Sequence, residues 1–146
     1  MDELAPSTIL PIASGLLSLE IASLAWMIRE ENRVAQRGNL SWFPIADFLN
    51  LFAIASTVAV FIGPLSGHEV TPSTKLLGLS LILFFGHMLS VIGHYELFIP
   101  RGRSYRYFPP QEIVCVLLTL STAGSYIYFV IINDSPALQA LLRQIL

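Results

Sequence analysis

Long apolar runs separated by short polar segments dominate this chain. Four of the runs are long enough to cross a bilayer, which requires roughly 20 helical residues each. They predict helices over residues 8–28, 43–65, 76–99 and 113–132. Because the intervening segments are short, the pattern predicts one all-α domain over residues 1–146, a polytopic integral membrane protein built as a four-helix transmembrane bundle.

A second, weaker pattern follows the last apolar run. Ser135 is suited to cap a helix, and Pro136 is suited to its first position. Apolar residues then recur at helical spacing at Leu138, Leu141, Leu142 and Ile145. The segment 135–146 is therefore predicted to form a short amphipathic helix, on the membrane surface or against a neighbouring subunit.

Composition supports a membrane protein. Of 146 residues, 54% are hydrophobic and only 12% are charged, whereas a soluble domain has about 25% charged residues. The net charge of −2 gives no reason to expect nucleic acid as a partner. The single cysteine, Cys115, excludes an internal disulfide or a cysteine-rich metal site. The acidic start, Asp2-Glu3, differs from a secretory signal, so the first span is expected to be retained.

The arginines predict an orientation. Six of the seven lie in two loops on the same side of a four-span protein: Arg29, Arg33, Arg37, Arg101, Arg103 and Arg106. The opposite side carries only Lys75 and Arg143 as basic residues. The positive-inside rule then places the arginine-rich loops in the cytoplasm, stroma or matrix and both termini outside.

The second arginine loop also carries aromatic side chains. It contains Arg101, Arg103, Tyr105, Arg106, Tyr107 and Phe108. Such a loop suits the headgroup layer, because arginines attract anionic lipids and aromatic rings anchor at the interface. Arginine and tyrosine are also frequent interface hot spots, so a docking surface for a protein partner is the alternative.

Polar residues recur on one face of the third predicted helix. Ser80, His87, Ser90 and His94 follow offsets of seven, three and four. Gly86 and Gly93 lie beside the histidines and would let a neighbouring helix approach closely. Ionisable residues inside a span are costly and usually face the bundle interior, so the two histidines are candidate functional residues.

Glu20, Asp47 and Asn50 are the matching polar residues on the first two helices. Measured from the predicted span centres, Glu20 lies near the depth of His87, and Asp47 lies near that of His94. The five residues would form a cluster if their faces meet, and such a cluster is a candidate proton or ion relay. Structural roles are the alternative to a relay, because the carboxyl group of Glu20 would also fit as a hydrogen-bonded structural group. Asp47 lies in a first helical turn, where capping is favoured.

Cofactor binding is another interpretation of the histidines. Neutral imidazole is an axial ligand for haem iron and would also suit a chlorophyll. Because His87 and His94 lie on one helix, haem would need a further ligand such as Met27 or a second copy of the chain, whereas chlorophyll needs one ligand. Two helical turns between the histidines are long for a zinc ion, and the only lysine, Lys75, lies too near a helix end for retinal.

The sequence contains no nucleophile–base pair, phosphate-binding loop or acid pair, so an enzyme is not favoured. The leading interpretation is a non-catalytic subunit or assembly factor of a larger membrane complex, in contact with other membrane subunits or with copies of itself. A haem or chlorophyll protein using His87 and His94, and proton or ion transport along Glu20, Asp47 and the histidines, are the alternatives.

Overall fold

The computed structural model describes residues 6–36, 44–65, 71–95 and 109–133. It contains the helices α1 (Pro6–Gln36), α2 (Ile45–Leu65), α3 (Thr71–His94) and α4 (Pro110–Tyr126), and α4 continues into a π-helical segment, η1 (Ile127–Ile132). All four helices are long and apolar enough to cross a membrane, judged by length and composition. The all-helical, four-span prediction is confirmed at this level.

Two predicted features lie outside the described residues. One is the amphipathic helix over residues 135–146, and the other is the aromatic surface formed by the loop 101–108.

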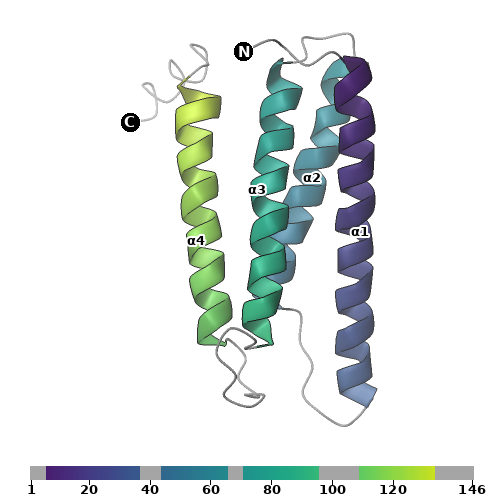
Figure 1. The fold of residues 1–146 in the computed structure, drawn as a ribbon, viewed down its shortest axis with the longest axis vertical. Helices are drawn as coiled ribbons and strands as arrows, with labels where there is room; N and C mark the ends of the chain where they lie inside the picture. Colours follow the sequence, from purple (N-terminus) through teal and green to yellow (C-terminus); the bar gives the residue numbers. More distant parts are fainter. Residues whose placement is uncertain (1–5, 37–43, 66–70, 96–108, 134–146) are drawn as a thin grey trace.

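Consecutive helices are antiparallel, and α3 lies between α4 and the α1–α2 pair (Figure 1). Helix α3 packs mainly against α2 and α4, while α1 packs mainly against α2. Among the described residues, α1 and α4 make no contact. We call the end where α1 and α3 finish and α2 and α4 begin the arginine end, because Arg29 and Arg33 lie there, and the opposite end the far end.

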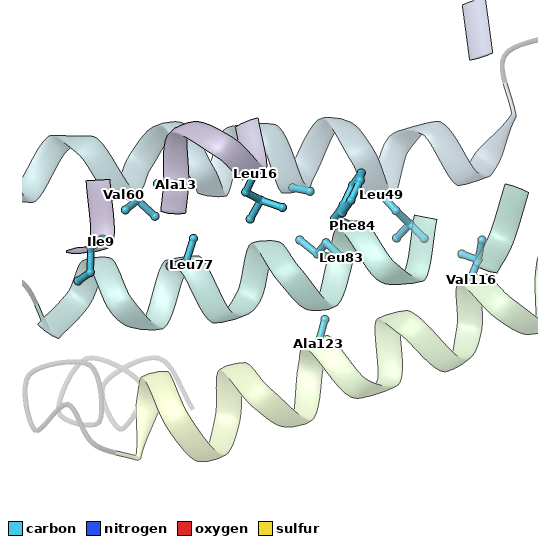
Figure 2. Close-up of a cluster of buried hydrophobic side chains, with 11 residues drawn as sticks. Ile9, Ala13, Leu16, Leu49, Val60, Leu77, Leu83, Phe84, Val116 and Ala123 are labelled. Atoms are coloured by element: carbon cyan, nitrogen blue, oxygen red, sulfur yellow. The ribbon is translucent and has the colours of Figure 1, made fainter. Parts of the chain in front are cut away.

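The helices pack along regular seams of buried residues. On α3 these residues follow alternating offsets of four and three: Ser73, Leu77, Ser80, Phe84, His87 and Val91. On α1 the same spacing runs through Ile9, Ala13, Leu16 and Glu20. A repeat of 3.5 residues keeps one stripe facing a nearly antiparallel neighbour, as in left-handed helical bundles. Figure 2 shows the apolar members of the seams pointing into the space between the helices.

Glycines allow α4 to lie close to α3, as the sequence predicted for Gly86 and Gly93. A Cβ at Gly86 would overlap the side chain of Thr119. A Cβ at Gly93 would lie 2.8 Å from backbone atoms of Gln111 and Glu112. A larger residue at either position would therefore push the two helices apart.

The largest differences from the predicted bounds are in α1 and α3. Helix α1 continues beyond residue 28 to Gln36, and α3 runs from Thr71 to His94 rather than from residue 76 to residue 99. Hydropathy detects only the apolar part of a helix, whereas polar turns at a membrane interface remain helical. In α1 the added turns include an ion pair between Arg33 and Glu30 at 2.9 Å, three residues apart.

The outward faces of the helices are apolar. On α1 they include Leu19 and Trp26, on α4 Leu118, and on η1 Phe129, all more than half exposed. Hydroxyl groups on outward faces bond to their own helix, as Ser14 does to the carbonyl of Leu10 at 2.8 Å. The bundle therefore presents to its surroundings a surface that suits lipid or another membrane helix.

Candidate functional site: a buried carboxyl–histidine network

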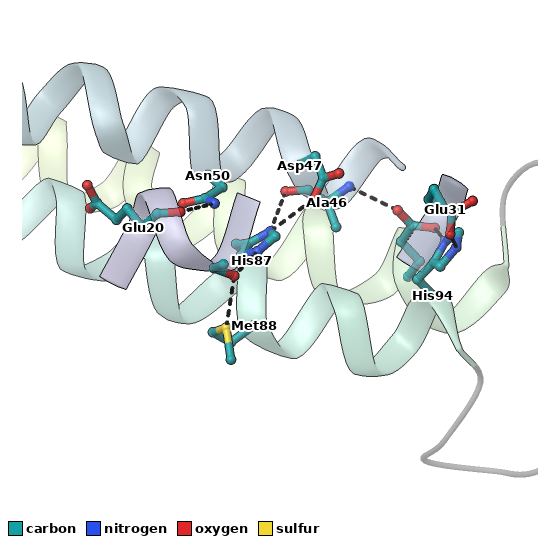
Figure 3. Close-up of polar contacts among 10 residues, drawn as sticks. Glu20, Glu31, Ala46, Asp47, Asn50, His87, Met88 and His94 are labelled. Atoms are coloured by element: carbon teal, nitrogen blue, oxygen red, sulfur yellow. Dashed lines mark hydrogen bonds and ion pairs between the residues drawn. The ribbon is translucent and has the colours of Figure 1, made fainter. Parts of the chain in front are cut away.

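Most of the buried polar side chains, together with three partly buried ones, form two groups, one deep in the bundle and one at the arginine end (Figure 3). The deep cluster consists of Glu20, Asn50, Thr57 and Ser80. The arginine-end network consists of Ser23, Glu31, Asp47, His87, His94 and Glu112. All four helices contribute to these groups, which join positions far apart in the sequence.

In the deep cluster, three side-chain oxygens lie in mutual contact. Oε1 of Glu20 accepts hydrogen bonds from the hydroxyls of Thr57 at 2.9 Å and Ser80 at 2.6 Å. The two hydroxyls are 2.5 Å apart, and Ser80 also reaches the carbonyl of Ala53 at 3.1 Å. Nδ2 of Asn50 donates to the backbone carbonyl of Glu20 at 2.9 Å. These contacts fix α1 against both α2 and α3.

The carboxyl group of Glu20 is fully buried. Within the described part of the chain, its second oxygen, Oε2, has no hydrogen-bond partner, and no lysine or arginine forms an ion pair with it. An uncompensated buried carboxylate is strongly unfavourable. The surroundings of Glu20 therefore suit the neutral acid better than the anion.

The ring of His87 is held at both nitrogens. Nδ1 lies 3.0 Å from the carbonyl oxygen of Ala46, and Nε2 lies 2.9 Å from Oγ of Ser23. A carbonyl only accepts hydrogen bonds, so Nδ1 carries a hydrogen. In the neutral ring Nε2 then accepts a hydrogen bond from Ser23. Oδ1 of Asp47 lies 3.7 Å from Nδ1, beyond hydrogen-bond distance but close enough for a strong charge interaction.

The hydroxyl of Ser23 has two alternative acceptors. It lies 2.9 Å from Nε2 of His87 and 3.7 Å from Sδ of Met88, and both contacts fall within hydrogen-bond range for their atom types. Because the hydroxyl carries one hydrogen, it donates to one acceptor at a time. Nε2 of His87 is thus able to change from acceptor to donor while the heavy atoms stay in place.

Glu112, at the start of α4, connects three helices. Its Oε2 lies 2.8 Å from Nδ1 of His94 on α3, and its Oε1 accepts the backbone N–H of Ala46 at 2.9 Å. Ala46 lies in the first turn of α2, where N–H groups have no partner within their own helix. Glu112 therefore caps α2 from another helix. On the other side of the His94 ring, Oε1 of Glu31 lies 3.7 Å from Nε2.

Glu112 supplies a cap on α2 that the sequence analysis did not identify. Asp47 lies in the first turn of α2, where a capping role was expected, and its Oδ1 has no hydrogen-bond partner among the described residues. Neither Glu112 nor Glu31 was among the candidate site residues predicted from the sequence. One signal was available, since Glu112 and His94 are both expected at the arginine end and hence at one depth.

The five predicted residues meet in a different order from that expected. Glu20 lies beside Ser80 rather than His87, and Asp47 lies beside His87 rather than His94. The reason is the early start of α3. The midpoint of the helix falls at an earlier residue than predicted. Every α3 residue therefore lies closer to the arginine end than expected. The fifth residue, Asn50, lies between Glu20 and His87 in Figure 3.

The histidines leave little room for an axial ligand bond. A metal in haem or chlorophyll needs a ring nitrogen that faces open space, whereas both nitrogens of His87 face protein atoms and its side chain is fully buried. Nδ1 of His94 is taken by Glu112. Among the described residues, no group of three or more His, Cys, Asp and Glu side chains could hold a metal ion.

No protein family, curated protein sequence or solved structure matches this chain.

Proposed function

We propose that this chain takes up protons at the arginine end of a membrane-spanning bundle and carries them inward to Glu20, as one small subunit of a larger membrane assembly. The observation that carries the proposal is the environment of His87, in which each ring nitrogen has a partner for both the neutral and the protonated ring. The orientation follows the positive-inside rule, so uptake is from the cytoplasm, stroma or matrix.

Protonation of His87 requires only a rearrangement of hydrogens. When Nε2 gains a proton it becomes a donor to Oγ of Ser23, and the hydroxyl hydrogen of Ser23 turns to Sδ of Met88. Nδ1 continues to donate to the carbonyl of Ala46. The carboxylate of Asp47 at 3.7 Å balances the new positive charge. Each donor keeps an acceptor in both states, as a reversible proton carrier requires.

Glu20 is the acceptor at the inner end of the path. If Oε1 carries a proton, it donates to Thr57, Thr57 donates to Ser80, and Ser80 donates to the carbonyl of Ala53. This series of hydrogen bonds uses three hydrogens for three bonds and leaves no donor unsatisfied. The neutral acid also avoids a buried charge for which no basic partner is described.

Asn50 connects the two groups. His87 follows Ser80 by seven residues, so they are separated by about 10 Å along α3. Oδ1 of Asn50 is buried and has no hydrogen-bond partner among the described residues. Such atoms are the usual ligands of bridging water, and Asn50 also bonds to the backbone of Glu20. A water-bridged step from His87 to Glu20 therefore completes the path.

The far half of the bundle explains why we propose a subunit rather than a complete transporter. Beyond Glu20, the buried side chains of α1, α2 and α3 include Ile9, Leu16, Val60 and Leu77. These side chains offer no proton acceptor, and the fully buried polar side chain described in the far half, Ser73, is not ionisable. Transfer beyond Glu20 thus requires polar groups from another subunit or a second copy, for which the apolar outward faces of α1 and α4 provide contact area.

The proposal is tested by infrared spectroscopy of the protein in lipid nanodiscs, which expose both bundle ends to solvent. We expect a carbonyl band of a protonated carboxyl group that disappears in Glu20→Gln. Transfer to D₂O should shift this band, because the acid proton exchanges. In His87→Leu the shift should be at least tenfold slower, since the inward path is interrupted.

Tyr126→Phe is the matched control. It removes a hydroxyl that bonds to the carbonyl of Lys75 at the far end, and it should leave the exchange rate unchanged. Absence of a Glu20 band in the wild-type protein would contradict the proposal that Glu20 is a neutral acid. Unchanged exchange in a folded His87→Leu protein, or slower exchange in Tyr126→Phe alone, would overturn uptake from the arginine end.

A further inference from the structure

An open pocket of about 450 Å³ lies on the outward side of α1 at the arginine end. Its described lining residues all lie on one face of this helix: Ala25, Ile28, Arg29, Asn32, Arg33 and Gln36. None of them belongs to the buried network, because the opposite face of α1 carries Glu20, Ser23 and Glu31. We call these six residues the α1 pocket.

The pocket changes character along the helix axis. Toward the bundle centre it is lined by Ala25 and Ile28, and toward the end of α1 it is lined by two arginines and two amide side chains. Arg29 directly follows the apolar run, and Arg33 lies one turn further, about 6 Å along the axis. The headgroup layer of one leaflet is roughly 5–7 Å thick. The donors of the pocket therefore span the depth of lipid phosphates.

The charge of the pocket is positive. Arg33 pairs with Glu30 at 2.9 Å and remains 54% exposed. Glu31, the next acidic residue, points inward to His94. Arg29 is exposed, and no acidic residue in the described ranges pairs with it. The pocket therefore offers a set of donors for an anion. They are the guanidinium of Arg29, which has no acidic partner among the described residues, the partly neutralised guanidinium of Arg33, and the amides of Asn32 and Gln36.

We propose that the α1 pocket binds the phosphate of an anionic phospholipid, whose acyl chains lie along Ile21, Ala25 and Ile28. Ile21 and Ile28 are 52% and 48% exposed, and the fourth helix does not cover this face because α1 and α4 make no contact among the described residues. A free phosphate ion would use the same donors, but only a lipid also fills the apolar part of the pocket. The site is separate from the proton path and does not depend on it.

The test is native mass spectrometry of the delipidated protein titrated with phosphatidylglycerol, and with phosphatidylcholine for comparison. We expect one phosphatidylglycerol to bind more tightly than phosphatidylcholine. Arg29→Gln and Arg33→Gln should each weaken binding about fivefold, and the double variant about 25-fold, as expected for two arginines near an anionic headgroup. Helical content measured by circular dichroism checks that each variant is folded.

Lys75→Gln is the charge-matched control, because it removes one positive charge near the far end of α3. It should bind phosphatidylglycerol as the wild-type protein does. Equal binding of the two lipids, or unchanged binding by the double variant, would overturn the proposal. Inorganic phosphate is the third probe, and displacement of the lipid by millimolar phosphate would show a free-anion site and overturn the lipid assignment.

Discussion

The far half and the arginine-end half of the bundle use the same seams but fill them with different chemistry. On α1 the seam changes from Ile9 and Leu16 to Glu20. On α3 the buried polar residue of the far half is a serine, Ser73, whereas the arginine-end half holds the ionisable His87. The same four helices run through both halves (Figure 1). The backbone architecture therefore does not decide where the polar interior lies, and the side chains at seam positions do.

The two halves are stabilised in different ways. Apolar side chains need only shape and volume from their neighbours, so Leu16 and Val60 tolerate some rearrangement. A buried polar group needs a specific partner, and Glu112 alone satisfies a histidine on α3 and a backbone N–H on α2. The arginine-end half should thus fix the register of the helices, while the far half contributes burial.

The largest effect is expected where one polar residue serves two helices. Glu112→Ala leaves Nδ1 of His94 and the N–H of Ala46 buried without their acceptor, so it should lower the free energy of unfolding by about 3–5 kcal/mol. Glu112→Gln keeps one acceptor oxygen and should cost about half as much. The measurement is the unfolding midpoint in mixed detergent micelles.

Glu30→Ala is the control for Glu112→Ala. Glu30 pairs with Arg33 on the surface, three residues apart on the same helix, and exposed pairs of this kind contribute little. Its free energy of unfolding should stay within about 0.5 kcal/mol of the wild-type value. Equal destabilisation by the two alanine substitutions would contradict the role of the arginine-end half in fixing the register.

An intermediate effect is expected in the far half. Leu16 is buried in the apolar core, and Leu16→Ala should cost about 2–4 kcal/mol through lost burial and a cavity. Leu19→Ala is the matched control, since Leu19 lies on the same helix and is 59% exposed. It should cost almost nothing in the same micelles. A larger loss at Leu19 would show that another protein surface covers the outer face of α1.

The sequence predicted the class of fold because apolar run length carries that information directly. It also predicted which residues face inward, since Ser80, His87 and Ser90 recur at helical spacing and are buried. Gly86 and Gly93 marked the close approach of another helix, and α4 occupies that position. These features depend only on spacing within one helix.

The pairing between helices was harder to predict, because it depends on axial offsets of a few ångströms. An early start of α3 was enough to move Glu20 from His87 to Ser80. Glu112 was not among the predicted site residues, because local sequence gives no sign of a cap supplied by a different helix. Partners of this kind follow from the three-dimensional arrangement and not from a pattern within one segment.

The smallest effect is expected at the boundary between the two halves, where its size distinguishes the neutral acid from the carboxylate at Glu20. Thr57→Val removes the hydroxyl that lies 2.9 Å from Oε1 of Glu20. A hydrogen bond between neutral groups contributes about 1 kcal/mol, and one to a charged group contributes about 1.5–3 kcal/mol. A double-mutant cycle of Thr57→Val with Glu20→Leu, measured in micelles, isolates this contact, because each substitution removes the hydrogen bond. The control Thr122→Val removes an exposed hydroxyl that bonds only to its own helix and should change little.

A coupling near 1 kcal/mol is expected for the neutral acid. A coupling above 2 kcal/mol would instead mean that Glu20 is buried as a carboxylate, and the boundary between the two halves would then carry a fixed charge rather than an exchangeable proton.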